Sequence, residues 1–374
     1  MTTSSSTPCN DVFVGFGARD GASGNAGGSD LSSIGDGLYR MLRHELKDAG
    51  CFEPALWRQM GNMVFVVSAF GLGYLTLLGD PATGPRLAAL VLIAFANVHA
   101  GFIAHDAGHR AVTRKRRIAD GIGYFFLTFL TAVTYGHFQD IHTRHHSNCN
   151  VRTHDPDMQS GAFSLYLESA FEKRGLGWLV TRYQAVLIWI LVSLQGFTLK
   201  IDSVRFMCRE PRRARVDWLI LPLHLALWSG LPVYVLGFGD AAVNYALMTW
   251  FTGPYLGAVF VVNHIGTEVI GPDDDISFFE QQITTTRNLG ASRIADFLFG
   301  GINNHIEHHL FPNLPRKGLR RARTITRDFC QRHGIPYRET SWLRAAAEVS
   351  RFLREVTESA RAIKHETRAA EGAS

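Results

Sequence analysis

The sequence predicts an all-α membrane protein in which four transmembrane helices form two hairpins, with interfacial helices and a cytoplasmic cap that carries three histidine clusters. Three observations predict this fold class: long uncharged apolar runs, basic connectors on one side of those runs, and histidine clusters at helical spacing near their ends. The chain has 374 residues and is 46% apolar. Its mean hydropathy of +0.01 conceals the contrast between apolar runs and basic connectors.

Four apolar runs are the predicted membrane spans. They cover residues 63–78, 87–104, 218–238 and 241–262, and they contain no Asp, Glu, Lys or Arg. The longer runs reach the roughly 20 residues that are needed to cross a hydrocarbon core. Turns at 79–85 and 237–240 would pair them into two hairpins. The alternative is a set of buried helices in a large soluble protein, but uncharged runs of this length are rare in soluble cores.

Two shorter apolar stretches, residues 118–133 and 186–199, are predicted to be interfacial or re-entrant. Basic connectors are usually cytoplasmic, which places residues 110–117 and 200–215 on the cytoplasmic side. If 118–133 crossed the bilayer, the first and second histidine clusters would lie on opposite sides of the membrane. No shared site could then form.

The two ends of the chain have different compositions from the middle. Residues 1–37 are rich in Ser, Gly and Thr and are expected to be disordered, without the basic start and apolar core of a signal peptide. We expect the membrane domain at 38–333 and an amphipathic, charged C-terminal helix and tail at 334–374. This helix should pack on the domain, with the membrane surface as the alternative. Its apolar face would consist of Leu343, Val349, Phe352, Leu353, Val356 and Ile363.

The cysteines and the net charge narrow the cellular setting. Cys9, Cys51, Cys149, Cys208 and Cys330 are odd in number and form no C-x-x-C pair, so we expect reduced thiols. The chain has 38 Lys and Arg against 33 Asp and Glu. We attribute this excess to anionic lipid headgroups and expect no nucleic acid partner.

Half of the sixteen histidines fall into three short clusters, H-D-A-G-H, H-T-R-H-H and H-I-E-H-H. Residues three or four apart share one face of a helix, so each cluster directs its imidazoles toward one point. Eight imidazoles are too many for one ion and suit two ions with open coordination positions. The clustered histidines are His105, His109, His142, His145, His146, His305, His308 and His309.

Spacing alone leaves Zn, Cu, Fe and Ni open as the metal. It excludes the zinc protease motif, which needs Glu directly after the first histidine of H-E-x-x-H. A lone histidine on an apolar helix is more often a hydrogen-bonded core residue than a ligand, and we apply that interpretation to His44, His224, His333 and His365. A metal transporter is a further alternative, but transporters place ionisable residues near the middle of the bilayer, whereas these clusters lie at the ends of spans.

The order and spacing of the three clusters resemble those of the integral-membrane fatty acid desaturase and hydroxylase superfamily. The resemblance covers about residues 87–316 and extends to G-G-I-N-N-H-I-E-H-H-L-F-P at 300–312 and D-P-D at 155–157. It implies a non-haem diiron enzyme that desaturates an acyl chain, bound as lipid, CoA or carrier thioester, with O2 and two electrons. A related diiron lipid hydroxylase or a carotenoid ketolase or hydroxylase is the alternative. Oxidation of an unactivated methylene requires a redox metal, which favours two Fe ions (Fe2+/Fe3+) over zinc.

The resemblance also implies a ninth histidine ligand from the segment before the third cluster, and His264 is the candidate. Some relatives place an Asn one helical turn before this histidine, where this chain has Phe260. Ligating histidines commonly donate their second N–H to a carboxylate. The candidate orienting carboxylates are Asp106, Asp140, Asp155, Asp157 and Glu307. The nearby histidines His99, His137 and His154 are further orienting groups, ligands of a variant site, or structural residues.

Two further features bear on substrate and partner. Relatives that act near the carboxyl end of the acyl chain often begin the third cluster with Gln, whereas this chain has His305. This difference weakens the assignment to that class without excluding it. The sequence contains no H-P-G-G haem signature, so we expect an external electron donor, a ferredoxin or a cytochrome. The basic segments 114–117 and 316–323 could dock this donor or anchor lipid headgroups. We expect the cytoplasmic membrane, with the active site on its cytoplasmic face.

Overall fold

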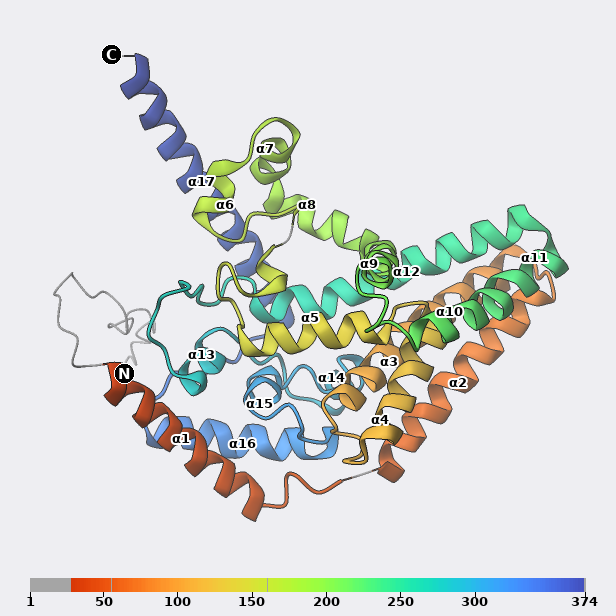
Figure 1. The fold of residues 1–374 in the computed structure, drawn as a ribbon, viewed down its shortest axis with the longest axis horizontal. Helices are drawn as coiled ribbons and strands as arrows, with labels where there is room; N and C mark the ends of the chain where they lie inside the picture. The colour runs from red at the N-terminus through yellow and green to blue at the C-terminus, as the bar shows by residue number, and fades with distance from the viewer. Residues whose placement is uncertain (1–27, 55, 160, 373–374) are drawn as a thin grey trace, which may run out of the picture.

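The computed structural model describes residues 28–54, 56–159 and 161–372, and over this part of the chain the protein is helical (Figure 1). The described residues form two isolated β-bridges, Val151 with Ile270 and Asn288 with Glu339, and no longer strand. The predicted all-α class is confirmed. In chain order the helices are α1 (Gly28–Asp48), α2 (Leu56–Leu78), α3 (Thr83–Gly108), α4 (Arg116–Gly123), η1 (Tyr124–Phe129), α5 (Tyr135–Ser147), η2 (Pro156–Gln159), α6 (Leu167–Glu172), α7 (Gly175–Arg182), α8 (Gln184–Leu191), η3 (Val192–Leu194), α9 (Gln195–Arg209), α10 (Asp217–His224), η4 (Leu225–Gly230), α11 (Leu231–Leu236), α12 (Phe238–His264), α13 (Phe278–Thr284), α14 (Arg293–Leu298), α15 (His305–Leu310), α16 (Arg316–Arg332) and α17 (Trp342–Gly372).

Five helical segments of the described chain are long and apolar enough to cross a membrane. They are Gln59–Leu78, Thr83–Gly108, Gln184–Arg209, Asp217–Leu236 and Phe238–His264. Four of them match the four predicted spans, except that the third ends at Leu236 instead of Phe238. The fifth contains stretch 186–199, which the sequence predicts to be interfacial or re-entrant, and it is longer than predicted because the helical segment has 26 residues. The charged residues at its C-terminal end conceal the length of this segment in the sequence.

The two predicted hairpins are present and extend together, at the right of Figure 1. Gly73 of α2 lies against α3, where an added Cβ would come 2.6 Å from Ile93 Cγ1. In the second hairpin, Gly237 has φ of 85°, a left-handed conformation that suits glycine and ends α11 before α12 begins. Outward-facing side chains such as Leu75 and Leu219 remain exposed, as expected for helices that face lipid.

Helix α12 also packs closely against the junction of α8 and α9 through glycines. A Cβ at Gly253 would lie 2.1 Å from Ser193 O, and one at Gly257 would lie 2.0 Å from Val192 Cγ2. The two glycines are four residues apart on one face of α12. Small residues at this spacing let two helix backbones approach within a membrane.

A cap of shorter helices lies at the opposite end from the hairpin tips (Figure 1). Its core joins α1, α13, α15 and α16 through residues such as Leu42, Ile283, Ile306 and Phe329. Helix α1 begins at Gly28, so the expectation of disorder is wrong for residues 28–37, while 1–27 lie outside the described residues. An amphipathic helix that buries Leu42 and Leu46 accounts for the order of this segment.

Helix α17 packs on the rest of the protein, as expected. Val349 and Leu353 are fully buried, and Trp342 Nε1 donates to Ala258 O at 2.7 Å. The predicted apolar face is wrong for Leu343, which is 74% exposed. Among the described cysteines, Cys51, Cys149, Cys208 and Cys330 are free, which agrees with reduced thiols, and Cys9 lies outside the described residues.

Candidate metal centre

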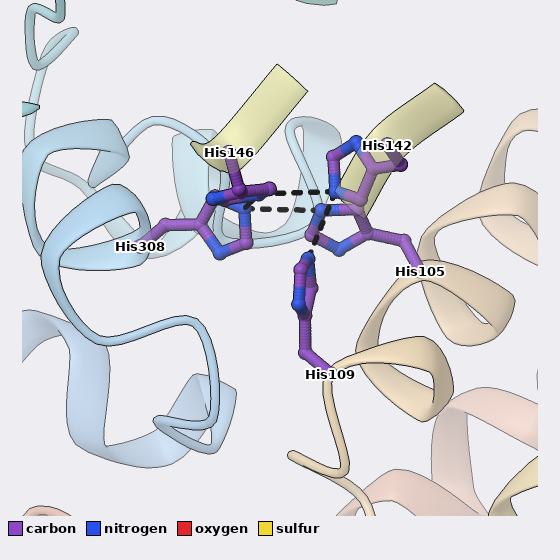
Figure 2. A group of neighbouring side chains, drawn as sticks. All are labelled: His105, His109, His142, His146 and His308. Carbon is purple, nitrogen blue, oxygen red and sulfur yellow. Dashed lines mark hydrogen bonds between the residues drawn. The ribbon is translucent and has the colours of Figure 1, made fainter. Parts of the chain in front are cut away.

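The structure gathers the clustered histidines into two adjoining groups where α3, α5 and α15 meet. In the first group, any two of the potential ligand atoms lie within 4.8 Å of each other. Figure 2 shows these five imidazoles directed toward a common centre. Group one consists of His105, His109, His142, His146 and His308. Its Nε2–Nε2 distances include 3.1 Å for His105–His308 and 2.8 Å for His109–His142.

The second group contains the remaining three clustered histidines together with His264. We define group two as His145, His264, His305 and His309, of which His145, His264 and His309 also lie close to Cys149. His264 Nε2 lies 3.2 Å from His145 Nε2 and 2.6 Å from His305 Nε2. The rings of His146 and His309 stack with centroids 4.2 Å apart, so the two groups are neighbours. All nine histidines singled out in the sequence therefore lie together.

The protonation states of six of these imidazoles fit metal binding. Burial lowers the pKa values of His109, His142, His146, His305, His308 and His309 well below the ordinary value, and neighbouring imidazoles lower them further. Metal ligation requires the neutral imidazole. His309 Nε2 is buried without a hydrogen-bond partner, while its Nδ1 lies 2.8 Å from Gln282 Oε1. A lone pair on Nε2 is thus free to coordinate.

His145 is held by carboxylates and behaves differently. Burial alone would lower its pKa, but the charges of Asp157 and Asp155 and a hydrogen bond to Asp155 raise it to about 9. Both carboxylate oxygens of the fully buried Asp155 lie 3.0 Å from His145 Nδ1. Asp155 also accepts hydrogen bonds from the backbone N–H groups of Asn150 and Asp157. The Nδ1 proton is therefore fixed, and Nε2 faces group two.

Similar contacts orient other histidines. Asp106 Oδ1 lies 3.3 Å from His105 Nδ1, and Asp106 Oδ2 accepts from Gln59 Nε2 at 2.6 Å and from Arg316 Nε. The Nδ1 of His264 is 3.1 Å from Thr285 O. Sequence reasoning missed Gln59, Gln282 and Arg316. An amide or guanidinium far along the chain from a cluster has no spacing signal that would single it out.

Two of the candidate carboxylates do not orient a histidine in the described structure. Asp140 pairs with Arg144 and Arg213, and Glu307 accepts from Asn288 Nδ2 at 2.9 Å and from Tyr337 OH at 2.7 Å. Glu307 sits between ligating positions on α15 and so points to the opposite face of that helix. Asp157 is an intermediate case, with Oδ2 3.4 Å from His145 Nδ1.

The histidines outside the two groups have structural or surface positions. His99 Nε2 lies 3.1 Å from Tyr255 OH, His137 packs on Phe206, and His154 is exposed. His224 is buried, with Nδ1 2.7 Å from Phe129 O, as expected for a core histidine. The same expectation is wrong for His44, His333 and His365, which are exposed.

Cys149 is a further residue beside group two that the sequence did not single out. Its Sγ lies 3.4 Å from His264 Nδ1, on the ring edge opposite the other imidazoles of the group. Burial raises the pKa of the thiol well above its ordinary value, which keeps it neutral. Its Sγ lies within 4.8 Å of ligand atoms of His145, His264 and His309, so Cys149 is a further candidate metal ligand.

A cavity of about 1150 Å³ opens onto both groups, and its walls include His105, His142, His145 and His264. Apolar residues of α3, α8, α9 and α12 line much of it, including Phe260 at the position where some relatives have Asn. Along α12 the wall runs from His264 back to Thr249, about 22 Å at roughly 1.5 Å per residue. The cavity follows the helices over a length that suits an extended chain.

Comparisons with known proteins agree with this geometry. The family described as "Fatty acid desaturase" matches residues 81–341. The chain is similar to the acyl-lipid (9-3)-desaturase of Borago officinalis, with 25% identity over 87% of this chain and 76% of the relative. It is also similar to the Delta(8)-fatty-acid desaturase 1 of Arabidopsis thaliana, with 28% identity over 82% of this chain and 72% of the relative. A third relative is the Delta(6)-fatty-acid desaturase fat-3 of Caenorhabditis elegans, with 27% identity over 80% of this chain and 70% of the relative. The chain therefore belongs to the fatty acid desaturase family and is an oxidoreductase of that class.

Proposed function

We propose that this protein introduces a double bond into an acyl chain with O2 and two electrons at a pair of iron ions. The observation that supports this most directly is the pair of adjoining imidazole groups, five and four in number, that open onto one long cavity. Group one would hold one ion and group two the other. When bound, the irons supply the oxidant for an unactivated methylene, which side chains cannot provide.

The residues of the chain have separate tasks in this reaction. The apolar cavity walls hold the acyl chain beside the histidines and keep water away from it. Asp106, Asp155, Gln282 and Thr285 O hold the Nδ1 edges, so that Nε2 of each ring faces the centre. Two hydrogens leave adjacent carbons of the chain, while O2 takes two electrons and two further protons and leaves as two waters.

Desaturation is preferred over a lipid hydroxylase or a carotenoid ketolase because the relatives in the comparison are named desaturases. We propose a lipid-linked or thioester-linked acyl chain as the substrate. The electron donor would be a separate ferredoxin or cytochrome that docks on exposed basic residues. Lys115, Arg117 and Arg321 are among these exposed residues.

We further propose four membrane spans, with the histidines on the cytoplasmic face of the cytoplasmic membrane. Segment Gln184–Arg209 would be re-entrant, because the residues before and after it both contact α5. Before it, Asp155 binds His145, and after it, Arg213 Nη2 donates to Asp140 Oδ1 at 2.6 Å. A full crossing would put these two contacts on opposite sides of the membrane. The 3-10 turn Val192–Leu194 interrupts the segment near its middle.

Expression in a host without such an activity, followed by analysis of its fatty acids, tests the proposal. We expect a new double bond in the host acyl chains and about two irons per purified chain. Unchanged acyl chains in cells that contain folded, iron-loaded protein would contradict desaturation. Products that carry oxygen from isotopically labelled O2 would favour the hydroxylase instead.

A further inference from the structure

The helical conformation is interrupted between η1 and α5, directly before the helix that carries the second histidine cluster. We call this interruption the break. Ala132 has φ of 59°, in the left-handed region that L residues rarely adopt. Such a break leaves carbonyl groups at the end of one helix and N–H groups at the start of the next without helical partners. In apolar surroundings an unpaired backbone group is costly, so these groups need partners from elsewhere.

Basic side chains from other helices meet the carbonyl side of the break. Lys200 of α9 donates from Nζ to Thr131 O. His224 of α10 lies with Nδ1 2.7 Å from Phe129 O. Tyr245 of α12 joins the two, with its OH 3.2 Å from both Lys200 Nζ and His224 Nε2. A cation is favoured at a helix C-terminus because of the exposed carbonyl groups there.

A carboxylate and a hydroxyl meet the amide side of the break. Asp217, fully buried at the start of α10, accepts from Tyr135 N at 3.1 Å and from Gly136 N at 3.2 Å. Ser203 Oγ of α9 accepts from Thr134 N at 2.9 Å. Thr128 Oγ1 donates to Asp217 at 2.7 Å and links the end of η1 to the same carboxylate. The carboxylate complements the positive end of α5.

Gly136 makes this contact possible. A Cβ at this position would lie 2.6 Å from Asp217 Oδ2, closer than a carbon can approach without displacement of the carboxylate. Helix α5 is 13 residues long and carries His142, His145 and His146, so it supplies ligands to both histidine groups. Its first turn is thus held by residues outside the histidine clusters.

We propose that Asp217 and Ser203 are positioning residues that fix α5 along its axis and so set the distance of the second histidine cluster from the other two. Lys200 and His224 support the same break from the carbonyl side. The inference rests on the proposed metal centre, which the experiment examines separately in the unaltered protein. The residues act through α5 and need not touch substrate or metal.

The test uses the full-length protein in detergent, freed of metal and titrated with Co2+, whose visible absorption reports the geometry of its ligands. Asp217→Ala should bind Co2+ about tenfold more weakly and with shifted absorption bands, in line with losses seen when residues that orient ligands are changed. Asp217→Asn keeps one acceptor oxygen, so its Co2+ affinity should lie between those of the unaltered protein and Asp217→Ala. The matched control is Asp202→Asn on α9, whose exposed carboxylate pairs with Arg205 and should leave the titration unchanged.

The outcomes separate positioning from mere stability. If Asp217→Ala lowers the melting temperature but keeps the Co2+ affinity and absorption bands of the unaltered protein, the proposal is wrong. If Asp217→Ala does not fold, Ser203→Ala and Gly136→Ala provide the same comparison, and unchanged bands in both would also overturn it. Failure of the unaltered protein to bind either Co2+ or iron would instead reject the metal centre itself.

Discussion

At the scale of single residues, the Nδ1 partners of the histidines decide how well the site binds metal. Asp155→Asn should lower iron affinity between 10- and 100-fold, because the amide still accepts from His145 but no longer carries the charge that makes the ring a strong ligand. Iron content after dialysis against a series of chelator concentrations measures this. Asp140→Asn is the control, since its carboxylate contacts only arginines. Equal losses in both variants would argue against orientation of His145 by Asp155.

The buried imidazoles predict how the metal-free protein responds to acid. Six of them have lowered pKa values, so the folded protein resists protons that the unfolded chain accepts below about pH 6.5. The contribution of these imidazoles to the free energy of unfolding should be fully present above about pH 6.5 and should be lost as the pH falls below it. His145, with its pKa raised to about 9, has the opposite effect and loses its contribution as the pH rises through 9.

The melting temperature of metal-free protein between pH 8 and 5 measures this acid response. His154→Ala removes an exposed histidine and should leave the profile unchanged. A melting temperature that stays constant down to pH 5 would mean that the six imidazoles are not buried as described.

At the scale of elements, close packing of α12 on η3 depends on glycine. Gly253→Ala should destabilise the protein by about 1–3 kcal/mol, because its Cβ would lie 2.1 Å from a backbone oxygen that cannot move aside easily. Gly239→Ala on the same helix meets no neighbour within 4 Å and should be neutral or slightly stabilising. Thermal unfolding in detergent compares the pair, and equal stability would show that the two backbones can separate at no cost.

Sequence patterns predicted some elements well and others poorly, for physical reasons. Uncharged runs and helical histidine spacing are strong local signals, and they predicted the hairpins and the eight clustered histidines, while the ninth, His264, was predicted from the family resemblance. Segment Gln184–Arg209 was underestimated because charged residues near its end lower the local hydropathy. Gln282 and Asp217 were not predicted as parts of the site, since their roles depend on contacts that only the folded chain creates.

At the scale of the whole molecule, α17 connects the C-terminal region to the metal centre. Its Glu348 pairs with the fully buried Arg287, whose guanidinium also donates to Ile265 O, next to His264. Glu348→Ala should cost about 3 kcal/mol, because it leaves a buried cation without its carboxylate. Glu355→Ala, at an exposed position of the same helix, should cost little. Unfolding curves of the two variants test this, and equal stability would show that α17 is not anchored through Arg287.

The short helix α5 also makes the two histidine groups thermodynamically dependent on each other. His142 and His146 face group one, while His145, between them in sequence, faces group two. The first turn of α5 is held by Asp217 and Ser203, so the first metal to bind would restrict only the histidine-bearing end of the helix, and the second would find its ligand already in place. Metal uptake should therefore be cooperative, with a Hill coefficient above one and few half-loaded molecules at any concentration.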